Sequence, residues 1–181
     1  ERVFIVDPID GTRAFIDGQT SFAHSLAIAE DGEVVAGVIY LPLKDRLYAA
    51  ARGHGATLND TPIRTSAIRE ARGAQLLATR PSLDPKHWPG GVPPVSRVYR
   101  PSLAYRLALV AEGRFDGMVT FRDTWEWDIA AGDILVREAG GRVSDARGRT
   151  PVYNGKAPMV AGFMAAGPGL HDDLLHDRLG H

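Results

Sequence analysis

Two aspartates and a glycine follow a short apolar run near the start of the chain, and their types and spacing suit phosphate chemistry. Residues 3–15 read VFIVDPIDGTRAF, with Asp7 and Asp10 three apart and Gly11 and Thr12 directly after them. Carboxylate oxygens are ligands for Mg²⁺, which commonly binds substrate phosphates as well. The amides of Gly11 and Thr12, at the start of an expected short helix capped by this segment, would face an anion. Together these groups describe a phosphoryl-transfer centre.

Turn formation is the simpler interpretation of the aspartate pair, because Asp favours turns and helix starts whatever the function. Two carboxylates at the end of one buried strand are costly unless a cation neutralises them, which favours a metal site. The carboxyl ends of strands are also where α/β sheets place ligands. Haloacid-dehalogenase-type phosphatases share an Asp…Asp-Gly-Thr pattern, but their aspartates are two apart. The spacing of three in this chain argues against that family.

A third carboxylate is available in the stretch TWEWDIAAGDILVREAGG at 124–141. Asp128 falls in the first turn of an expected helix, where an acidic residue is favourable by itself. The surrounding pattern is less generic, with Ile-Ala-Ala-Gly after the aspartate and Ala-Gly-Gly at the helix end. Asp128 is therefore the candidate third carboxylate.

Hydrophobic patterning around these residues indicates a mixture of hairpins and crossover helices. Ser25–Glu30 and Glu33–Tyr40 flank Asp31-Gly32, the favoured turn of a two-residue hairpin. Further strands are expected at 3–6, 46–51, 76–79, 115–121, 142–145 and 159–162, and helices between Ser102 and Gly113, over 125–139 and from Pro168. The proline-rich stretch 81–94 is expected to be an irregular loop that joins two sheets. This pattern favours a mixed α+β fold of layered sheets and helices.

Composition and charge exclude several classes of function. The chain has 181 residues, a formal net charge of −1 and no cysteine. A nucleic-acid or membrane-surface binder would show a basic footprint, and no apolar run approaches a membrane span. The lack of cysteine excludes a disulfide framework, a thiolate metal site and a cysteine nucleophile. We expect a cytoplasmic protein that binds neither nucleic acid polymers nor membranes.

Together the two acidic stretches resemble the inositol monophosphatase superfamily, which consists of Mg²⁺-dependent, lithium-sensitive phosphatases of small phosphorylated metabolites. Residues 7–15 match the pattern Asp-Pro-(Ile/Leu)-Asp-Gly-Thr with Phe after two further residues. Residues 127–141 match Trp-Asp-x-Ala-(Ala/Gly), followed by a helix that ends in Ala-Gly-Gly. The segments SLAIAEDGEVVAGVIYLP and ARGHGATLNDTPI also look like the family's. The resemblance implies a layered αβαβα sandwich of the sugar-phosphatase type, N-terminally incomplete in this chain.

Carried onto this chain, the resemblance implies a site for two or three Mg²⁺ ions. Its ligands would be the carboxylates of Asp7, Asp10 and Asp128 and the main-chain carbonyl of Ile9. Asp7 and Asp10 are thereby also implied to be catalytic. The implied reaction is hydrolysis of a phosphate monoester by direct in-line attack of metal-activated water, without a phospho-enzyme.

The resemblance also implies which residues contact the substrate. Gly11 and Thr12 would hold phosphate through their main-chain amides, with the Thr12 hydroxyl near the attacking water, so that Thr12 is counted as catalytic. Substrate-binding roles are implied for Asp10, Ser102 and Asp128.

Two departures from the inositol monophosphatase pattern indicate a particular branch. Those enzymes place a glutamate that binds a substrate hydroxyl seven residues before the third aspartate, where this chain has Phe121. Their Gly-Ser-Ala segment is replaced by PSLA at 101–104. The stretch SLAYRLALVAEGRFDG looks closer to bacterial 3′(2′),5′-bisphosphate nucleotidases, which convert adenosine 3′,5′-bisphosphate to AMP. Inositol monophosphatase and sugar bisphosphatase are the alternatives.

A bisphosphate substrate would need a cationic partner for its second phosphate. Arginine suits bidentate phosphate contacts, and the candidates in this chain are Arg100, Arg106 and Arg122.

The resemblance also predicts how this chain relates to a complete family member, how it divides into lobes and how it assembles. Family members carry a glutamate metal ligand and a water-orienting aspartate well upstream of the Asp-Pro motif, and this chain begins at Glu1. We therefore interpret it as the C-terminal part of a longer phosphatase. Residues 1–80 would be the end of an N-terminal metal-binding sheet lobe, and 81–181 a C-terminal α/β lobe. A catalytically silent fragment that binds a phosphorylated metabolite is the alternative of another class. Relatives are commonly homodimers, so a homodimer is expected.

Overall fold

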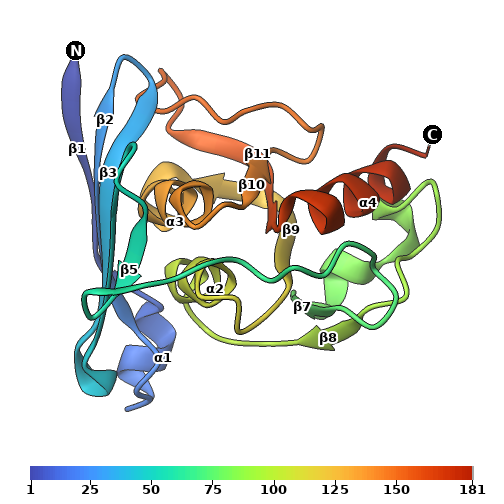
Figure 1. Ribbon diagram of the computed structural model, residues 1–181, viewed down its shortest axis with the longest axis horizontal. Coiled ribbons are helices and arrows are strands. Elements are labelled where there is room, and N and C mark those ends of the chain that lie inside the picture. The colour runs from blue at the N-terminus through green and yellow to red at the C-terminus, as the bar shows by residue number, and fades with distance from the viewer. Residues whose placement is uncertain (181) are drawn as a thin grey trace.

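A computed structural model describes residues 1–180, and its elements form alternating layers of sheet and helix (Figure 1). The first sheet is antiparallel and contains, in spatial order, β1 (Arg2–Asp10), β2 (Ala23–Glu30), β3 (Glu33–Leu41), β4 (Arg46–Ala51), β5 (Ala56–Leu58) and β6 (Thr61–Pro62). The second sheet has the order β10-β11-β9-β7-β8, built from β7 (Gln75–Leu77), β8 (Ser96–Val98), β9 (Gly117–Trp125), β10 (Arg142–Ser144) and β11 (Met159–Ala166). The helices within these residues are α1 (Thr12–Ile16), α2 (Leu103–Ala111), α3 (Glu126–Glu138) and α4 (Pro168–Leu179).

Two helices, α2 and α3, lie between the sheets, and α4 covers the far side of the second sheet (Figure 1). Successive side chains of a strand point to opposite faces. Leu77 and Met118 accordingly pack in the core cluster that α2 and α3 share with the first sheet. Their neighbours Leu76 and Val119 pack in a second cluster with leucines of α4. The second sheet is therefore buried on both faces, and the predicted mixed α+β fold of layered elements is confirmed.

Local signals in the sequence correctly predicted the elements that carry the candidate residues. Asp31 and Gly32 join β2 to β3 with φ of 50° and 87°, the backbone of a tight two-residue hairpin. Ser102 is the N-cap of α2, because its hydroxyl accepts the main-chain N–H of Tyr105 at 3.1 Å. Within residues 1–180, no helix has both the length and the apolar character needed to cross a bilayer.

Within residues 1–180, β1 is less buried than its apolar run predicted. Among the described residues 1–180 it pairs only with β2, in an antiparallel sheet. Ile5 faces the core, whereas Phe4 and Val6 are 72% and 44% exposed on the outer face of the sheet. One covered and one open face is a common state of antiparallel sheets. The aspartates consequently do not lie at the carboxyl edge of a parallel sheet, and another feature must make them converge.

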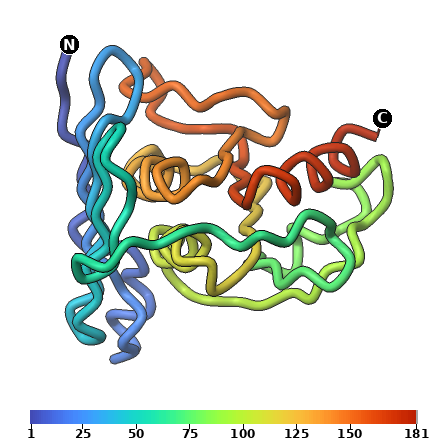
Figure 2. Tube along the Cα trace, in the orientation of Figure 1, coloured from blue at the N-terminus to red at the C-terminus, as the bar shows by residue number. Residues whose placement is uncertain are grey.

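The loop at 81–94 does not join the two sheets, as its prolines suggested. It connects β7 to β8 within the second sheet and contains short 3₁₀ turns at Arg80–Leu83 and Pro85–His87. The chain passes between the sheets in segment 63–74 instead (Figure 2). The Thr65 N–H in this segment donates to the Ala139 carbonyl at 3.0 Å, which ties the crossing to the end of α3. The division into lobes at residue 80 stays a prediction.

Candidate metal centre

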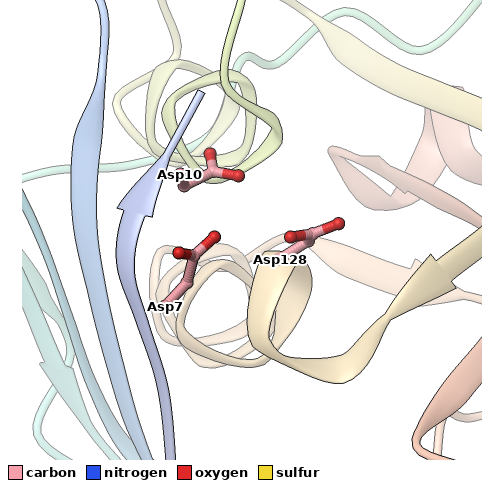
Figure 3. A group of neighbouring side chains, drawn as sticks. All are labelled: Asp7, Asp10 and Asp128. Carbon is pink, nitrogen blue, oxygen red and sulfur yellow. The ribbon is translucent and has the colours of Figure 1, made fainter. Parts of the chain in front are cut away.

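A β-bulge in β1 makes Asp7 and Asp10 point to the same side (Figure 3). In a regular strand, residues three apart point to opposite faces. Asp7 pairs with Ser25 of β2 and Asp10 with Ala23, so β1 contains one extra residue between the two pairs. Pro8 lies in this interval and has no N–H to give to the ladder, which favours irregular pairing there. The bulge therefore turns a spacing of three into a converging pair of carboxylates.

The third carboxylate comes from the first turn of α3. The start of this helix is anchored by the buried side chain of Glu126, which accepts the main-chain N–H groups of Asn154 at 2.9 Å and Gly155 at 3.3 Å. Asp128, two residues on, faces the two β1 aspartates (Figure 3). One carboxylate oxygen from each of the three aspartates lies within 4.8 Å of the other two. The structure thus brings the three predicted ligands together.

The N-terminus of α2 holds Asp10 in place. The Ser102 hydroxyl and the Ala104 N–H, the latter at 2.9 Å, both donate to Oδ2 of Asp10. Asp10 is 5% exposed, so these hydrogen bonds satisfy a buried carboxylate. The predicted short helix does start at this segment, with Gly11 as the N-cap of α1, but no side chain makes a capping hydrogen bond there. Ala104 is a partner that sequence reasoning missed, since nothing in the sequence pairs an alanine amide with Asp10.

Gly11 lies where no other residue fits easily. Its φ of +84° is in the left-handed region. A Cβ on Gly11 would also lie 3.1 Å from the Cβ of Ser102, the residue that binds Asp10. The glycine therefore allows β1 to turn into α1 while it stays close to the start of α2.

The remaining predicted residues, Ile9 and Thr12, are linked to each other. The Thr12 hydroxyl donates to the Ile9 carbonyl at 2.9 Å, and the Ile9 N–H donates to Oδ1 of Asp7 at 3.0 Å. A carbonyl oxygen has two lone pairs, so this bond leaves the Ile9 carbonyl with one for a further ligand.

Electrostatics at the three aspartates oppose full ionisation. Burial raises the pKa of Asp10 to about 6, although the hydrogen bonds from Ser102 and Ala104 act in the other direction. Burial, together with the negative charges of Asp10 and Asp7, raises the pKa of Asp128 to about 7. Burial raises the pKa of Asp7 as well.

These aspartates fit a hard divalent cation. Among residues 1–180, no lysine or arginine forms an ion pair with any of the three carboxylates. A divalent cation would supply the missing positive charge, and a set of oxygen ligands alone suits Mg²⁺. The donor chemistry of this cluster therefore fits the predicted metal.

The raised pKa values predict how the stability of the metal-free protein depends on pH. A carboxyl whose folded pKa lies above its unfolded value stabilises the fold at low pH, and this contribution is lost as pH rises through the folded pKa. For Asp128 the loss falls between about pH 4 and about pH 7. We therefore expect Asp128→Asn to melt at a higher temperature than the wild type in EDTA. This difference in melting temperature should be small near pH 4 and should grow as the pH rises toward about 7.

The difference between the two proteins is the quantity to measure, because His171 acts in the opposite direction. Burial lowers the pKa of His171 to about 4, so that group stabilises the fold as pH rises. The His171 contribution is common to both proteins and cancels. A difference that stays constant over this pH range would contradict the electrostatic account of the cluster.

The three candidate arginines differ in how far they are already engaged. Arg106 is buried, donates through Nε to the Arg100 carbonyl at 2.5 Å and lies over the ring of Tyr99 at 4.8 Å. Arg100 lies over the ring of Phe115 at 5.4 Å. Arg122 is exposed and makes no side-chain hydrogen bond or ion pair with the part of the chain that the structure describes. Of the three, Arg122 is the one available to a ligand.

Comparison with known proteins identifies the family. The sequence model of the inositol monophosphatase family matches residues 1–180. The chain belongs to this family. Inositol-1-monophosphatase of Rhizobium meliloti (strain 1021) is 40% identical over 174 residues, which cover 91% of this chain and 62% of the relative. The predicted superfamily is thereby confirmed.

Solved structures of family members have the same fold. The extragenic suppressor protein SuhB from Bartonella henselae superposes with a TM-score of 0.85 at 34% identity, covering 99% of this chain and 73% of that one. The structure of SaIMPase-II bound to 2′AMP gives a TM-score of 0.85 at 27% identity and covers 99% of this chain and 69% of that one. This chain spans less than two thirds of the length of the R. meliloti inositol monophosphatase.

Proposed function

We propose that the full-length gene product is a Mg²⁺-dependent phosphomonoesterase that hydrolyses a small phosphorylated metabolite. The observation that carries this proposal is the convergence of three carboxylates from β1 and α3, within 4.8 Å of one another. Their oxygen-only chemistry suits Mg²⁺ rather than metals that prefer nitrogen or sulfur ligands. Membership of the inositol monophosphatase family supports the same activity.

In this proposal the three aspartates and the Ile9 carbonyl hold two or three Mg²⁺ ions. Bound Mg²⁺ supplies Lewis acidity, which lowers the pKa of water and neutralises charge on the leaving oxygen. The chain's own contribution is to fix the ligands before the ions arrive. Asp10 is held by Ser102 and Ala104 of α2, and Asp7 by the Ile9 N–H. Ligands held in this way lose little conformational freedom on binding.

Gly11 and Thr12 are assigned to the phosphate, and Thr12 also to the attacking water. The Thr12 hydroxyl gives its proton to the Ile9 carbonyl at 2.9 Å. A hydroxyl that donates its one proton can still accept hydrogen bonds. Thr12 would therefore act on a nearby water as an acceptor, orienting its lone pair toward phosphorus. Ser102, beside Asp10, is assigned to the substrate.

Two substrate classes have support. The R. meliloti relative is named an inositol-1-monophosphatase, and SaIMPase-II has been solved with 2′AMP bound. Polyol phosphates and nucleotides are therefore both candidates. Phe121, in place of a hydroxyl-binding glutamate, favours the nucleotide reading. Our preferred substrate is adenosine 3′,5′-bisphosphate, with AMP as product; inositol 1-phosphate and fructose 1,6-bisphosphate are the alternatives.

Phosphate release from these three esters tests the proposal directly. We expect release with Mg²⁺, none in EDTA, and inhibition by Li⁺. A higher kcat/KM for inositol 1-phosphate than for adenosine 3′,5′-bisphosphate would reassign the branch to inositol monophosphatase. If calorimetry detects binding of these esters but no phosphate is released, the protein binds a phosphorylated metabolite without hydrolysing it, and the assignment as an enzyme is wrong.

A further inference from the structure

A histidine of β2 bonds to the backbone of the β-bulge in β1. Pro8 and Ile9, the two bulge residues between the paired aspartates, lie opposite a single residue of β2, His24. A bulge with two residues against one bends its strand and disrupts the local ladder. At this point Nδ1 of His24 lies 2.5 Å from the Pro8 carbonyl oxygen. A side chain of β2 thus contacts the segment that makes the two aspartates converge.

Nδ1 of His24 is the donor in this hydrogen bond. A carbonyl oxygen only accepts hydrogen bonds, so the ring must carry a proton on Nδ1. The neutral Nδ1–H tautomer and the imidazolium both satisfy this condition. The bond to Pro8 therefore does not require a charged histidine, and what it controls is the direction of the Pro8 carbonyl.

Aromatic neighbours on two sides hold the His24 ring. Its centroid lies 6.0 Å from the ring of Phe22, edge-on, and 6.3 Å from the ring of Tyr40, its cross-strand partner on β3. Phe22 in turn meets Phe15 of α1 edge-on at 5.0 Å. Aromatic rings at such distances attract one another beyond the burial of their surface. These contacts restrict the ring and keep its Nδ1 directed at the bulge.

The hydrogen bond from His24 reaches a predicted metal ligand through one peptide group. The Pro8 carbonyl and the Ile9 N–H belong to the same trans peptide unit, in which they point in opposite directions within one plane. The Ile9 N–H donates to Oδ1 of Asp7 at 3.0 Å. Holding the carbonyl end of this plane at His24 therefore also holds the N–H end at Asp7.

His24 acts from the face of the sheet opposite to the metal centre. Side chains alternate along β2, so the buried Ser25 faces the core, and His24 shares the other face with the exposed Leu26. Asp7 pairs directly with Ser25 and so lies on the core side. Within residues 1–180, the group of possible metal ligands contains the three aspartates and not His24. The histidine therefore acts on the backbone of the bulge and not on the ion.

We propose that His24 is a positioning residue for the metal centre, which holds Asp7 in its ligand orientation through the Pro8–Ile9 peptide group. The inference rests on the proposed function, because it concerns a ligand of the proposed Mg²⁺ ions. Loss of a group that orients a metal ligand typically costs about 10–100-fold in metal affinity. Since His24 acts through an intervening peptide group, we expect the lower end of this range.

Two variants of the full-length gene product separate the donor from the ring. His24→Phe keeps an aromatic ring beside Phe22 and Tyr40 and removes the Nδ1 donor. Its affinity for Mn²⁺, measured from the EPR signal of the free ion, should fall about tenfold. The Mg²⁺ concentration that gives half-maximal phosphate release should rise by the same factor, while kcat at saturating Mg²⁺ stays within about threefold. His24→Asn restores an N–H donor and should recover most of the affinity.

Amide hydrogen exchange in EDTA adds a readout that needs neither metal nor turnover. Exchange reports local opening of a hydrogen bond, here the bond from the Ile9 N–H to Asp7. We expect the Ile9 amide to exchange faster in His24→Phe than in the wild type and in His24→Asn. Equal exchange in all three proteins would contradict the link through the peptide plane.

Leu174→Val is the control for a loss of stability alone. Leu174 of α4 is buried in the second core cluster, apart from the first sheet. This variant should melt at a lower temperature and keep the Mn²⁺ affinity of the wild type. Unchanged Mn²⁺ affinity in His24→Phe, or an equal loss in Leu174→Val, would overturn the inference. Failure of the proposed function is distinguishable, because then no ester releases phosphate while Mn²⁺ binding still depends on His24.

Discussion

Asp128→Asn should reduce phosphate release by more than about 100-fold while the protein stays folded. Loss of a residue that only supports a metal ligand typically costs about 10–100-fold, and Asp128 is proposed as a ligand itself. The substitution keeps the size of the side chain and removes one of three carboxylates within 4.8 Å of one another. The measurement is kcat/KM for adenosine 3′,5′-bisphosphate with Mg²⁺ at saturating and limiting concentrations.

The same variant carries its own control for folding. Without metal, removing one negative charge should raise the melting temperature near neutral pH, because repulsion from Asp7 and Asp10 contributes to the raised pKa of Asp128. Mg²⁺ should then stabilise the variant less than the wild type. A variant that is more stable without metal but nearly inactive excludes misfolding as the cause. Activity within a few-fold of the wild type would contradict the assignment of Asp128 as a ligand.

Gly132→Ala should destabilise the fold by about 2 kcal/mol, or roughly 4–8 °C in melting temperature for a domain of this size. Gly132 is in α3 where this helix crosses α2, and a Cβ there would lie 2.9 Å from Cγ of Leu107 and closer still to its Cβ. The Leu107 Cβ is fixed to the α2 backbone, so the helices must separate. Alanine alone would favour an exposed helix by about 1 kcal/mol. Thermal or urea unfolding therefore shows which effect is larger: a less stable variant means that the clash with Leu107 outweighs the higher helix propensity of alanine.

Gly155→Ala is the matched control for this substitution. Gly155 has an ordinary negative-φ backbone, and the nearest neighbour to an added Cβ is the Ala157 carbonyl at 3.5 Å. We expect a change within about 0.5 kcal/mol. Equal stability of both variants would mean that α2 and α3 are not as close as described. Because α2 also carries Ser102 and Ala104, a shift of this helix should weaken Mg²⁺ binding in Gly132→Ala as well.

Sequence patterns predicted the elements well where the signal is local. The Asp31-Gly32 hairpin, the Ser102 cap and the glycine stop after α3 depend on the backbone preferences of a few neighbouring residues. The environment of β1 was not predictable in this way. Four consecutive apolar residues fit a fully buried strand as well as one with an exposed face, and the elements that pack around β1 decide between them.

The three aspartates were candidates from residue type, spacing and resemblance, but the reason they converge was not. The register shift opposite Ser25 and Ala23 depends on how β2 pairs, which no local signal encodes. No local signal encodes the hydrogen bond from the Ala104 N–H to Asp10 either, nor the cavity between the β7–β8 loop and β9. Lys86 and Arg122 are 36 positions apart and line one cavity only because the β7–β8 loop folds back beside β9.

Anomalous diffraction from crystals of the full-length gene product soaked in Mn²⁺ tests the central claim most directly. Mn²⁺ accepts the oxygen ligands that Mg²⁺ prefers and scatters anomalously. The account predicts at least one strong peak among the carboxylates of Asp7, Asp10 and Asp128, and its loss in Asp128→Asn. Mn²⁺ bound elsewhere, with no peak among these three carboxylates at saturating concentration, would contradict the metal centre and the phosphatase function that depends on it.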